Sequence, residues 1–342
     1  MNHYIQTINE QLHPKINGTY KVLDLFAGCG GLSLGFEAAG FETIAYEMEQ
    51  AAVDTYNKNL QGHCIAQKLT VDTCYQHAID IIVGGPPCQP FSVGGQQKGI
   101  SDERNGFPVF IKAIQELKPK LWLFENVRGM LYSNKAYFEK ILDDLSATGY
   151  TISYQLLNAV HYGIPQNRER LFVIGHRNNF NFPKLGLSKV TVQEAIGDLI
   201  DTIHDESKIL TSSMDTYIAK YEKASHCINP RDLYLHKPAR TLTCRNIAGS
   251  TGDMQRVKLA DGRRRRISVR EAARLQSFPD WFEFMGSETQ QFYQIGNAVP
   301  PLLALQLAES VKNCLMSGEH KHVFNKPQKK MPTRQMSLLC DF

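Results

Sequence analysis

Short apolar runs alternate along the first half of the chain with longer segments whose apolar residues recur every three or four positions. Continuous apolar runs bounded by glycine, proline or polar residues are typical of parallel strands that are buried on both faces. The amphipathic segments between them are typical of helices. The alternation therefore predicts βαβ units and a doubly wound, mostly parallel α/β sheet. The apolar runs are residues 20–26, 42–49, 79–85, 120–127, 150–160 and 168–177, and the amphipathic segments are residues 107–119 and 134–149.

The same pattern divides the chain into five parts. Residues 1–19 are polar and are expected to form a loose lead-in, whereas residues 20–179 carry the strand and helix alternation. Periodicity weakens over residues 180–265, which are richer in glycine and polar side chains, so a separate, irregular domain is expected there. Helical periodicity returns over residues 266–318, and the basic, proline-containing residues 319–342 are expected to form a flexible tail.

Composition narrows the class of protein only moderately. Hydrophobic residues make up 42% of the 342 residues, which is enough for a large core and excludes global disorder. The formal net charge of +4 permits a nucleic-acid partner without demanding one, because a local patch matters more than the sum. No secretory signal pattern and no apolar run of about 20 residues is visible, so we expect a cytoplasmic protein.

The eight cysteines are scattered and form no C-x-x-C pair. This distribution favours a reducing compartment over a disulfide framework, and it gives no reason to expect a zinc site or any other metal site.

Ligands of open parallel sheets bind beyond the carboxyl ends of the strands, so the residues that follow each apolar run are candidate site residues. The first run leads into the segment 27–31, Ala-Gly-Cys-Gly-Gly, where glycines let the backbone approach a ligand and open a helix. The full G-x-G-x-x-G signature is absent, and a structural tight turn would account for these glycines as well. The second run carries Glu47, whose carboxylate can accept both hydroxyls of a ribose; a solvated surface acid is the plainer alternative.

The third run ends in two glycines and two prolines followed by Cys88. Pro86 and Pro87 lack amide hydrogens and have a fixed φ, so they end the strand and stiffen the turn that presents the cysteine. A free cysteine is usually a small buried residue, and we assign the other seven to that role. For Cys88, the rigid turn and the carboxylate of Glu125 after the next run favour a nucleophile.

Two further groups of polar residues complete the candidate site. Arg168 and Arg170 start an apolar run, and alternation along a strand places both guanidinium groups on one face, where they can bind a base carbonyl, a phosphate or a carboxylate. A salt-bridged surface pair with Glu169 or other residues is the alternative. Asn297 lies in a tight turn before a helix and is either a polar contact or a cap.

Together these segments resemble the DNA cytosine-C5 methyltransferases of the compact bacterial type. The resemblance covers about residues 20–178 and 265–315, and six motifs in the family's order make it specific. They are "DLFAGCGG" (24–31), "GGPPCQPFS" (84–92), "ENVRG" (125–129), "QNRERLFVIG" (166–175), "SVREAARLQSFPD" (268–280) and "QIGNAVPP" (294–301).

The resemblance implies a Rossmann-like class I methyltransferase sheet, S-adenosylmethionine as cofactor with S-adenosylhomocysteine as product, and double-stranded DNA as partner. It implies that the target cytosine is flipped out of the duplex before reaction. It also implies a monomer that works in the bacterial cytoplasm on host DNA, in a restriction-modification system whose cognate nuclease is a functional rather than a physical partner.

The catalytic roles also come from the resemblance. The Cys88 thiolate adds to C6 of the cytosine and makes C5 reactive toward the methyl group. Glu125 acts at ring N3 and neutralises the electrons that arrive on the ring. Arg170, with Arg168 nearby, holds the pyrimidine and the active-site loop. Loss of the C5 proton then expels Cys88 and restores the ring.

Cofactor and DNA contacts follow from the same comparison. Phe26 is expected to pack on the adenine, Glu47 to bind the ribose, and Asn297 with Ala298 to close the methionine end. Residues 91–100 are glycine-rich and are expected to close over the DNA, with Gln89 and Ser92 near its backbone. The other expected cofactor contacts are Ala27, Gly28, Gly30, Gly31, Leu32 and Met48.

One position departs from the family pattern. An acidic residue usually follows the third strand and contacts the adenine amino group, whereas here Lys68 occupies that place and Asp72 lies further on. Asp72 or a backbone group is expected to supply this contact instead.

The irregular segment 180–265 is expected to be the target-recognition domain. Arginine bound to guanine edges is the commonest specific contact in protein–DNA complexes, and Arg240 and Arg245 are the candidates for it. The arginine run 263–266 is expected to meet phosphates, unless it is a solvated basic turn. The recognition sequence itself cannot be read from these residues.

Three other functions were weighed against this one. A tRNA cytosine methyltransferase would use the same catalytic set, but its additional Cys-Phe-Thr stretch is not visible. A non-catalytic DNA-binding regulator on the same fold is disfavoured by the intact Cys88, Glu125, Arg168 and Arg170, and a lead-in of 19 residues is too short for an added domain. A NAD-dependent oxidoreductase is disfavoured by the glycine spacing.

Overall fold

The structure is a computed structural model. It describes residues 2–75, 78–87, 105–186, 188–202, 205–224, 226, 231–248 and 253–319. The expectations for Cys88, Gln89, Ser92, the segment 91–100 and the tail beyond residue 319 therefore lie outside the described residues.

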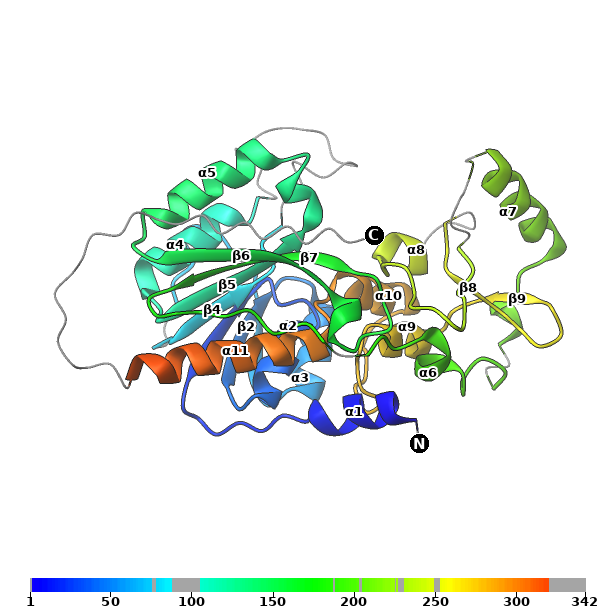
Figure 1. The fold of residues 1–342 in the computed structure, drawn as a ribbon, viewed down its shortest axis with the longest axis horizontal. Helices are drawn as coiled ribbons and strands as arrows, with labels where there is room; N and C mark the ends of the chain where they lie inside the picture. The colour runs from blue at the N-terminus through cyan, green and yellow to red at the C-terminus, as the bar shows by residue number, and fades with distance from the viewer. Residues whose placement is uncertain are drawn as a thin grey trace.

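A seven-stranded sheet forms the centre of the molecule, as the alternation of apolar runs predicted (Figure 1). Its strand order is β3-β2-β1-β4-β5-β7-β6, and β7 alone runs antiparallel to its neighbours. The prediction of a doubly wound, mostly parallel sheet is confirmed. The strands are β1 (Lys21–Leu25), β2 (Glu42–Glu47), β3 (His63–Ala66), β4 (Ile81–Gly84), β5 (Leu121–Val127), β6 (Thr151–Asn158) and β7 (Glu169–His176).

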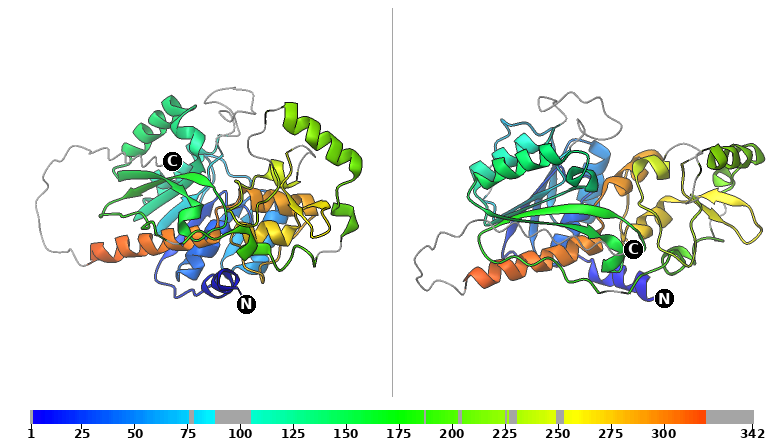
Figure 2. Two further views of the ribbon diagram at one scale, coloured as in Figure 1. Left: turned by 45° about the vertical axis from the view of Figure 1, so that its right-hand side comes forward. Right: turned by 45° about the horizontal axis from the view of Figure 1, so that its top comes forward.

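Helices cover both faces of the sheet (Figure 2), so a hydrophobic core lies on each face. Successive residues of a strand point alternately into these two cores. Leu121 and Leu123 of β5 point into one core, and Trp122 and Phe124 point into the other. The first core lies under α2 (Gly31–Ala38), α3 (Gln50–Asn59) and α11 (Pro301–Glu319), and the second lies under α4 (Phe107–Leu117) and α5 (Lys135–Ser146). Within the part of the chain that the structure describes, no helix is both long and apolar enough to cross a membrane.

The segment expected to be a target-recognition domain projects from one end of the sheet (Figure 1), and its described residues form the 13-residue helix α7 and several elements of three to five residues. Leu210, Ile218 and Met254 form a small core of its own. The chain then returns to the sheet domain through α9 (Val269–Leu275), α10 (Glu288–Asn297) and α11. The elements of this region are α6 (Val192–Ile196), η4 (Glu206–Lys208), α7 (Ser212–Ala224), α8 (Cys244–Ala248), β8 (Arg256–Lys258) and β9 (Arg264–Arg266).

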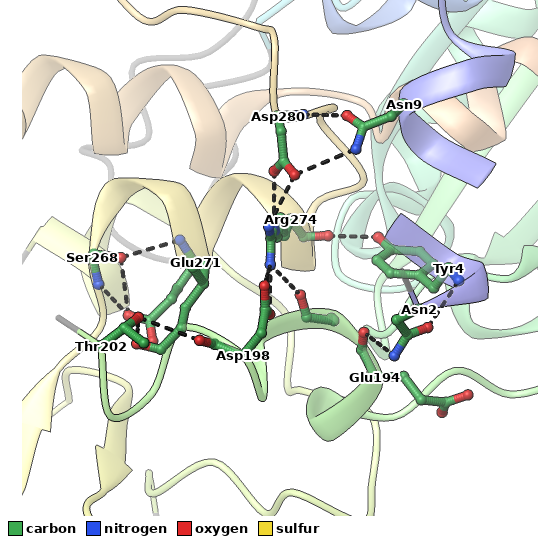
Figure 3. Close-up of polar contacts among 12 residues, drawn as sticks. Asn2, Tyr4, Asn9, Glu194, Asp198, Thr202, Ser268, Glu271, Arg274 and Asp280 are labelled. Atoms are coloured by element: carbon green, nitrogen blue, oxygen red, sulfur yellow. Dashed lines mark hydrogen bonds and ion pairs between the residues drawn. The ribbon is translucent and has the colours of Figure 1, made fainter. Parts of the chain in front are cut away.

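The N-terminal residues form a docked helix, so the expectation of a loose lead-in is wrong for them. Helix α1 (His3–Gln11) buries Tyr4, Ile5 and Ile8, which share one helical face, and Leu12 is buried directly after it. The Tyr4 hydroxyl donates a hydrogen bond of 2.5 Å to the carbonyl of Arg274 (Figure 3). The apolar spacing was visible in the sequence, but it covers only about two turns and needed a partner surface to become significant.

Arg274 of α9 joins three parts of the molecule (Figure 3). Its Nη1 atom lies 2.7 Å from Oδ1 of Asp198 just after α6, and its Nε atom lies 2.7 Å from Oδ1 of Asp280. Asp280 in turn accepts a hydrogen bond from Asn9 of α1. The small projecting region is therefore anchored at its start to both the N-terminal helix and α9.

Candidate active site at the carboxyl edge of the sheet

The strand register brings the predicted strand-end residues into one row. Leu25 of β1 pairs with Tyr46 of β2 and with Gly84 of β4, and Gly84 pairs with Phe124 of β5. These strands are parallel, so the residues that follow emerge at the same edge. The residues that come next at this edge are Phe26, Glu47, Gly85 and Glu125.

Glu125 and Arg170 form an ion pair at this edge. The Nε atom of Arg170 lies 2.8 Å from Oε1 of Glu125, and each side chain is 12% exposed. Because β7 is antiparallel, its first residues start where β5 ends, and Arg170 lies beside Val127 in the register. The alternative of a salt-bridged surface pair with Glu169 or other residues is wrong for Arg170, since its ion pair with Glu125 is largely buried and the Glu169 carboxylate pairs with the exposed Arg128.

Burial changes the proton affinity of this pair. Desolvation raises the pKa of Glu125 above its usual value, although the positive charges of Arg170 and Arg168 oppose the change. A carboxyl with a raised pKa can hold a proton closer to neutral pH and can donate it to a ring nitrogen. Burial lowers the pKa of Arg170, with Glu125 opposing, but an arginine stays charged at any pH of interest.

The residues before Cys88 are tied firmly to this edge. The side-chain amide of Asn126 donates a 2.9 Å hydrogen bond to the carbonyl of Pro86, and the amide of Gly106 donates a 3.0 Å bond to the carbonyl of Pro87. A Cβ on Gly85 would lie 3.7 Å from Oε2 of Glu125. The Glu125 carboxylate thus lies against the chain three residues before Cys88. Sequence reasoning did not single out Asn126, although it lies inside the "ENVRG" motif.

Arg168 has different partners from Arg170. It precedes β7, is 1% exposed, and donates hydrogen bonds to the backbone carbonyls of Leu242, Gly296 and Ala298. Burial lowers the pKa of Arg168, and the charge of Arg170 lowers it further, while Glu125 opposes the change. Neighbouring positions in one motif therefore have distinct contacts.

Glu47 is organised by the glycine turn that follows β1. Its Oε2 atom accepts a 2.9 Å hydrogen bond from the amide of Gly28, and its Oε1 atom accepts bonds of 2.8 and 3.0 Å from the amides of Met48 and Glu49. The alternative of a merely solvated surface acid is wrong. A carboxylate has about four lone-pair sites and three are used by these amides, so Oε2 of Glu47 retains capacity for one hydroxyl of a ligand.

The glycine turn also packs against the segment that follows α10. Gly30 has φ of 87° and caps α2, a conformation that side-chain-bearing residues rarely adopt. A Cβ on Gly31 would lie 2.5 Å from the carbonyl oxygen of Val299 and 3.1 Å from Cβ of Ala298, so only glycine permits this approach. The predicted cofactor residues from the two ends of the chain are thereby brought together.

The remaining predicted cofactor residues differ in exposure. Leu32 is buried in the core, whereas Met48 is 60% exposed and Asn297, the last residue of α10, is also exposed. Phe26 has a positive φ of 62°, which is uncommon outside glycine and occurs where neighbouring structure enforces it. Lack of solvent raises the pKa of the Cys29 thiol to about 12, in keeping with a packing role.

Lys68 and Asp72, the two residues at the departure from the family pattern, are both exposed after β3. Strand β3 ends at Ala66, which pairs with Glu47, so Lys68 follows close to the expected cofactor site.

The arginines of the projecting region fall into two groups. Arg245 is 81% exposed, with Nε 3.8 Å from Oδ2 of Asp253, and Arg240 is half-buried. Within the run 263–266, Arg265 is fully buried and Arg264 pairs with two aspartates. The expectation that this run meets phosphates is wrong for Arg265, because its guanidinium faces the equally buried Glu271.

Fold and site together define a class of protein. A doubly wound sheet carries a glycine turn with an organised carboxylate on its first two strands, and a buried acid–cation pair two strands away. This is the class I methyltransferase fold, whose ligands bind beyond the carboxyl ends of the strands.

Comparisons with known proteins identify the family within this class. A model of the C-5 cytosine-specific DNA methylase family matches residues 20–313, and the chain belongs to this family. It is 55% identical over 307 residues to the type II methyltransferase M.AplI of Arthrospira platensis, covering 89% of both chains. It is 34% identical to the type II methyltransferase M.FnuDI of Fusobacterium nucleatum, covering 87% of this chain and 96% of that one.

Solved structures agree on the fold. A DNA modification methyltransferase encoded within an E. coli prophage superimposes with a TM-score of 0.66 at 27% identity, over 87% of this chain and all of the other. The S. pombe Dnmt2 methyltransferase superimposes with a TM-score of 0.67 at 20% identity, over 86% of this chain and 99% of that one.

Proposed function

We propose that this protein transfers a methyl group from S-adenosylmethionine to C5 of a cytosine in double-stranded DNA, with Cys88 as nucleophile. The observation that carries the proposal is the buried Glu125–Arg170 pair at the sheet edge, with the Glu125 carboxylate against Gly85, which precedes the Pro-Pro turn that leads to Cys88. Its relatives named as type II methyltransferases support a role in a restriction-modification system.

The residues at the glycine turn fit a nucleoside-containing cofactor. Glu47 offers carboxylate oxygens held in place by three backbone amides, and Gly31 keeps the turn close to Ala298. Phe26 at the end of β1 supplies an aromatic surface for a base. The cofactor, when bound, supplies an electrophilic methyl group.

The reaction needs cytosine C5 to become a nucleophile. Addition of the Cys88 thiolate to C6 pushes electron density toward C5 and N3, and Glu125 protonates N3 to accept it. Arg170 is held by Glu125 and by the carbonyl of Glu169, so it presents a fixed donor to the oxygen of the base. Abstraction of the C5 proton then lets the Cys88 sulfur leave with its electron pair and restores the ring.

The base must leave the DNA stack to reach this edge, because the Glu125–Arg170 pair is largely buried at the carboxyl ends of the strands. We propose that the region 180–265, with Arg240 and Arg245, reads the sequence around it, and that Gln89 and Ser92 contact the DNA backbone. The resemblance to the compact bacterial methyltransferases supports our proposal that the protein acts as a monomer in the cytoplasm.

The test is methyl transfer from labelled S-adenosylmethionine to mixed-sequence duplex DNA and, separately, to tRNA, followed by mapping of the methylated cytosines. Label at C5 within one short DNA motif is the expected result. Label in tRNA alone would assign the same chemistry to RNA, and label in neither, with cofactor bound, would leave a non-catalytic binding protein.

A further inference from the structure

Three buried polar side chains meet where the projecting region joins the sheet domain. Gln166 and Gln276 are 0% exposed and Arg168 is 1% exposed. The side-chain amide of Gln166 donates hydrogen bonds to Oε1 of Gln276 at 2.5 Å and to the carbonyl of Leu275 at 3.1 Å. Buried polar groups are costly unless they are satisfied, so this cluster is a specified feature of the fold.

The cluster holds both backbone polar groups of one residue in the projecting region. Oε1 of Gln166 accepts a 2.8 Å hydrogen bond from the amide of Leu242, and Nη1 of Arg168 donates a 2.6 Å bond to the carbonyl of Leu242. The amide of Asn167 also donates to the carbonyl of Ala239 at 2.8 Å. The segment 239–242, which adjoins the DNA-reading candidates, is therefore fixed to the chain that leads into β7.

The same cluster holds the segment that closes the cofactor site. Nη2 of Arg168 donates hydrogen bonds to the carbonyls of Gly296 at 3.0 Å and Ala298 at 2.9 Å, and the side-chain amide of Gln276 donates to Ala298 at 2.6 Å. Ala298 packs on Gly31 of the glycine turn. One guanidinium thus spans the DNA-reading segment and the cofactor segment.

If the only role of this position were to hold the two segments together, a neutral hydrogen-bonding side chain would do so with a smaller desolvation penalty. Burial of a cation is expensive, and every hydrogen-bond acceptor of Arg168 in the described chain is a backbone carbonyl rather than a carboxylate. Its Nε atom is buried without a hydrogen-bond partner among the described residues. The rigid, forked guanidinium has more donors than the amide of glutamine, so it can hold three carbonyls from two segments at once.

We propose that Arg168 is a positioning residue that links the DNA-reading segment 239–242 to the cofactor segment 296–298, so that DNA and cofactor bind cooperatively through it. The inference rests on the proposed function, because it needs DNA to bind at the projecting region. A cofactor that orders the carbonyls of Gly296 and Ala298 also orders Arg168, and through it Leu242, so the second ligand meets a site that is already arranged.

The experiment measures this link as a ratio of dissociation constants. The affinity for a duplex carrying the methylated motif is measured with and without saturating S-adenosylhomocysteine, and the affinity for S-adenosylhomocysteine is measured with and without that duplex. Both ratios must agree, and we expect each to be about 5-fold or more in the unaltered protein. In Arg168→Lys, which keeps the charge but loses the fork, both ratios fall toward 1.

A second variant guards against a simple folding defect. Gln276→Met keeps the volume and removes the bond to Ala298 and the bond from Gln166, while Gln166 keeps its bond to Leu275 and Arg168 keeps its bonds, so the ratio is expected to fall partway. Arg128→Ala, on the exposed Arg128–Glu169 pair, is the matched control and keeps the full ratio. Thermal unfolding of each variant shows that the proteins compared are folded.

Three outcomes decide the matter. Loss of the ratio in Arg168→Lys with separate binding of each ligand retained supports the inference. An unaltered ratio in a folded Arg168→Lys protein, or no cooperativity in the unaltered protein while it methylates DNA, overturns the inference alone. Failure of the unaltered protein to bind or methylate DNA overturns the proposed function, and the inference with it.

Discussion

The carboxyl edge of the sheet and the projecting region both contain arginines, but they use them differently. At the sheet edge, Arg170 faces one carboxylate and remains 12% exposed beside the site. In the projecting region, Arg265 is enclosed with Glu271, and Arg256 is enclosed with Asp232 and Glu222. An arginine's role is thus set by the partner that tertiary structure brings to it, and a run of basic residues does not by itself mark a DNA contact.

The largest effect is expected at the sheet edge. Glu125→Gln keeps the shape of the side chain but removes the proton donor, so turnover should fall by about 10²- to 10⁴-fold. Arg128→Ala is the control on the neighbouring exposed pair, and its rate should stay within about 2-fold of the unaltered protein. Initial rates of methyl incorporation into DNA measure both, and equal rates for the two variants would contradict the role of Glu125.

The dependence of activity on pH is expected to differ between the unaltered protein and Glu125→Gln. Glu125 acts in its protonated form, so activity should fall as pH rises through its pKa, which burial raises above the usual range. Glu125→Gln should lose this descending limb, because its residual rate no longer depends on that proton. A limb that persists unchanged in the variant would have to come from another group.

The buried pair of the projecting region predicts a large effect on stability. Arg265→Ala leaves Glu271, 0% exposed, without its partner and should lower the free energy of unfolding by about 3–5 kcal/mol. Arg263→Ala, whose side chain is 53% exposed, should change it by less than about 0.5 kcal/mol. Urea unfolding compares them, and similar losses would mean that the two arginines are equivalent after all.

Asp24 of β1, which lies just before the glycine turn, is expected to have a smaller and pH-dependent effect on the free energy of unfolding. Burial raises its pKa from 3.8 to about 7 in the folded protein, with a hydrogen bond from Ser33 opposing. As pH rises, the unfolded chain loses the Asp24 proton at a lower pH than the folded protein does. The contribution of Asp24 to the free energy of unfolding is therefore fully present below pH 3.8 and is lost as pH rises toward 7. At about 1.4 kcal/mol per pKa unit, the loss is at most about 4 kcal/mol.

Asp24→Asn should remove this dependence while keeping an acceptor for Ser33. The variant should gain about 1–3 kcal/mol over the unaltered protein at pH 8 and little at pH 4. Urea midpoints across that range provide the measurement. A gain that is the same at both pH values would show that Asp24 does not titrate between them.

The smallest effect on stability is expected at Arg245. Its side chain is 81% exposed, so Arg245→Ala should leave the free energy of unfolding within about 0.5 kcal/mol. If it reads a guanine, the same change should lower discrimination at one base pair by about 1–3 kcal/mol. Competition between motif variants tests this, and a uniform loss across all sequences would assign Arg245 to a phosphate.

The sheet and its edge were predictable because strand periodicity and strand-end residues are local features. Glu47 and Glu125 both lie at the edge that the alternation predicted. The docking of α1 and the partners of Arg265 depend on residues far away in the chain, such as Arg274 for Tyr4. Nothing in the local sequence distinguishes Arg168 from Arg170, and only the tertiary contacts separate them.

The most direct test of the central claim is a trapping experiment with duplex DNA in which the target cytosine carries fluorine at C5. Release of Cys88 requires loss of the C5 hydrogen as a proton. Fluorine at C5 cannot be lost as a cation, so the Cys88 adduct should persist after methyl transfer. Mass spectrometry should find one covalent complex per site, joined through Cys88, and none in Cys88→Ser with its fold and cofactor binding intact. A methylated product without any adduct, or an adduct at another residue, would contradict the assignment of Cys88 as the nucleophile.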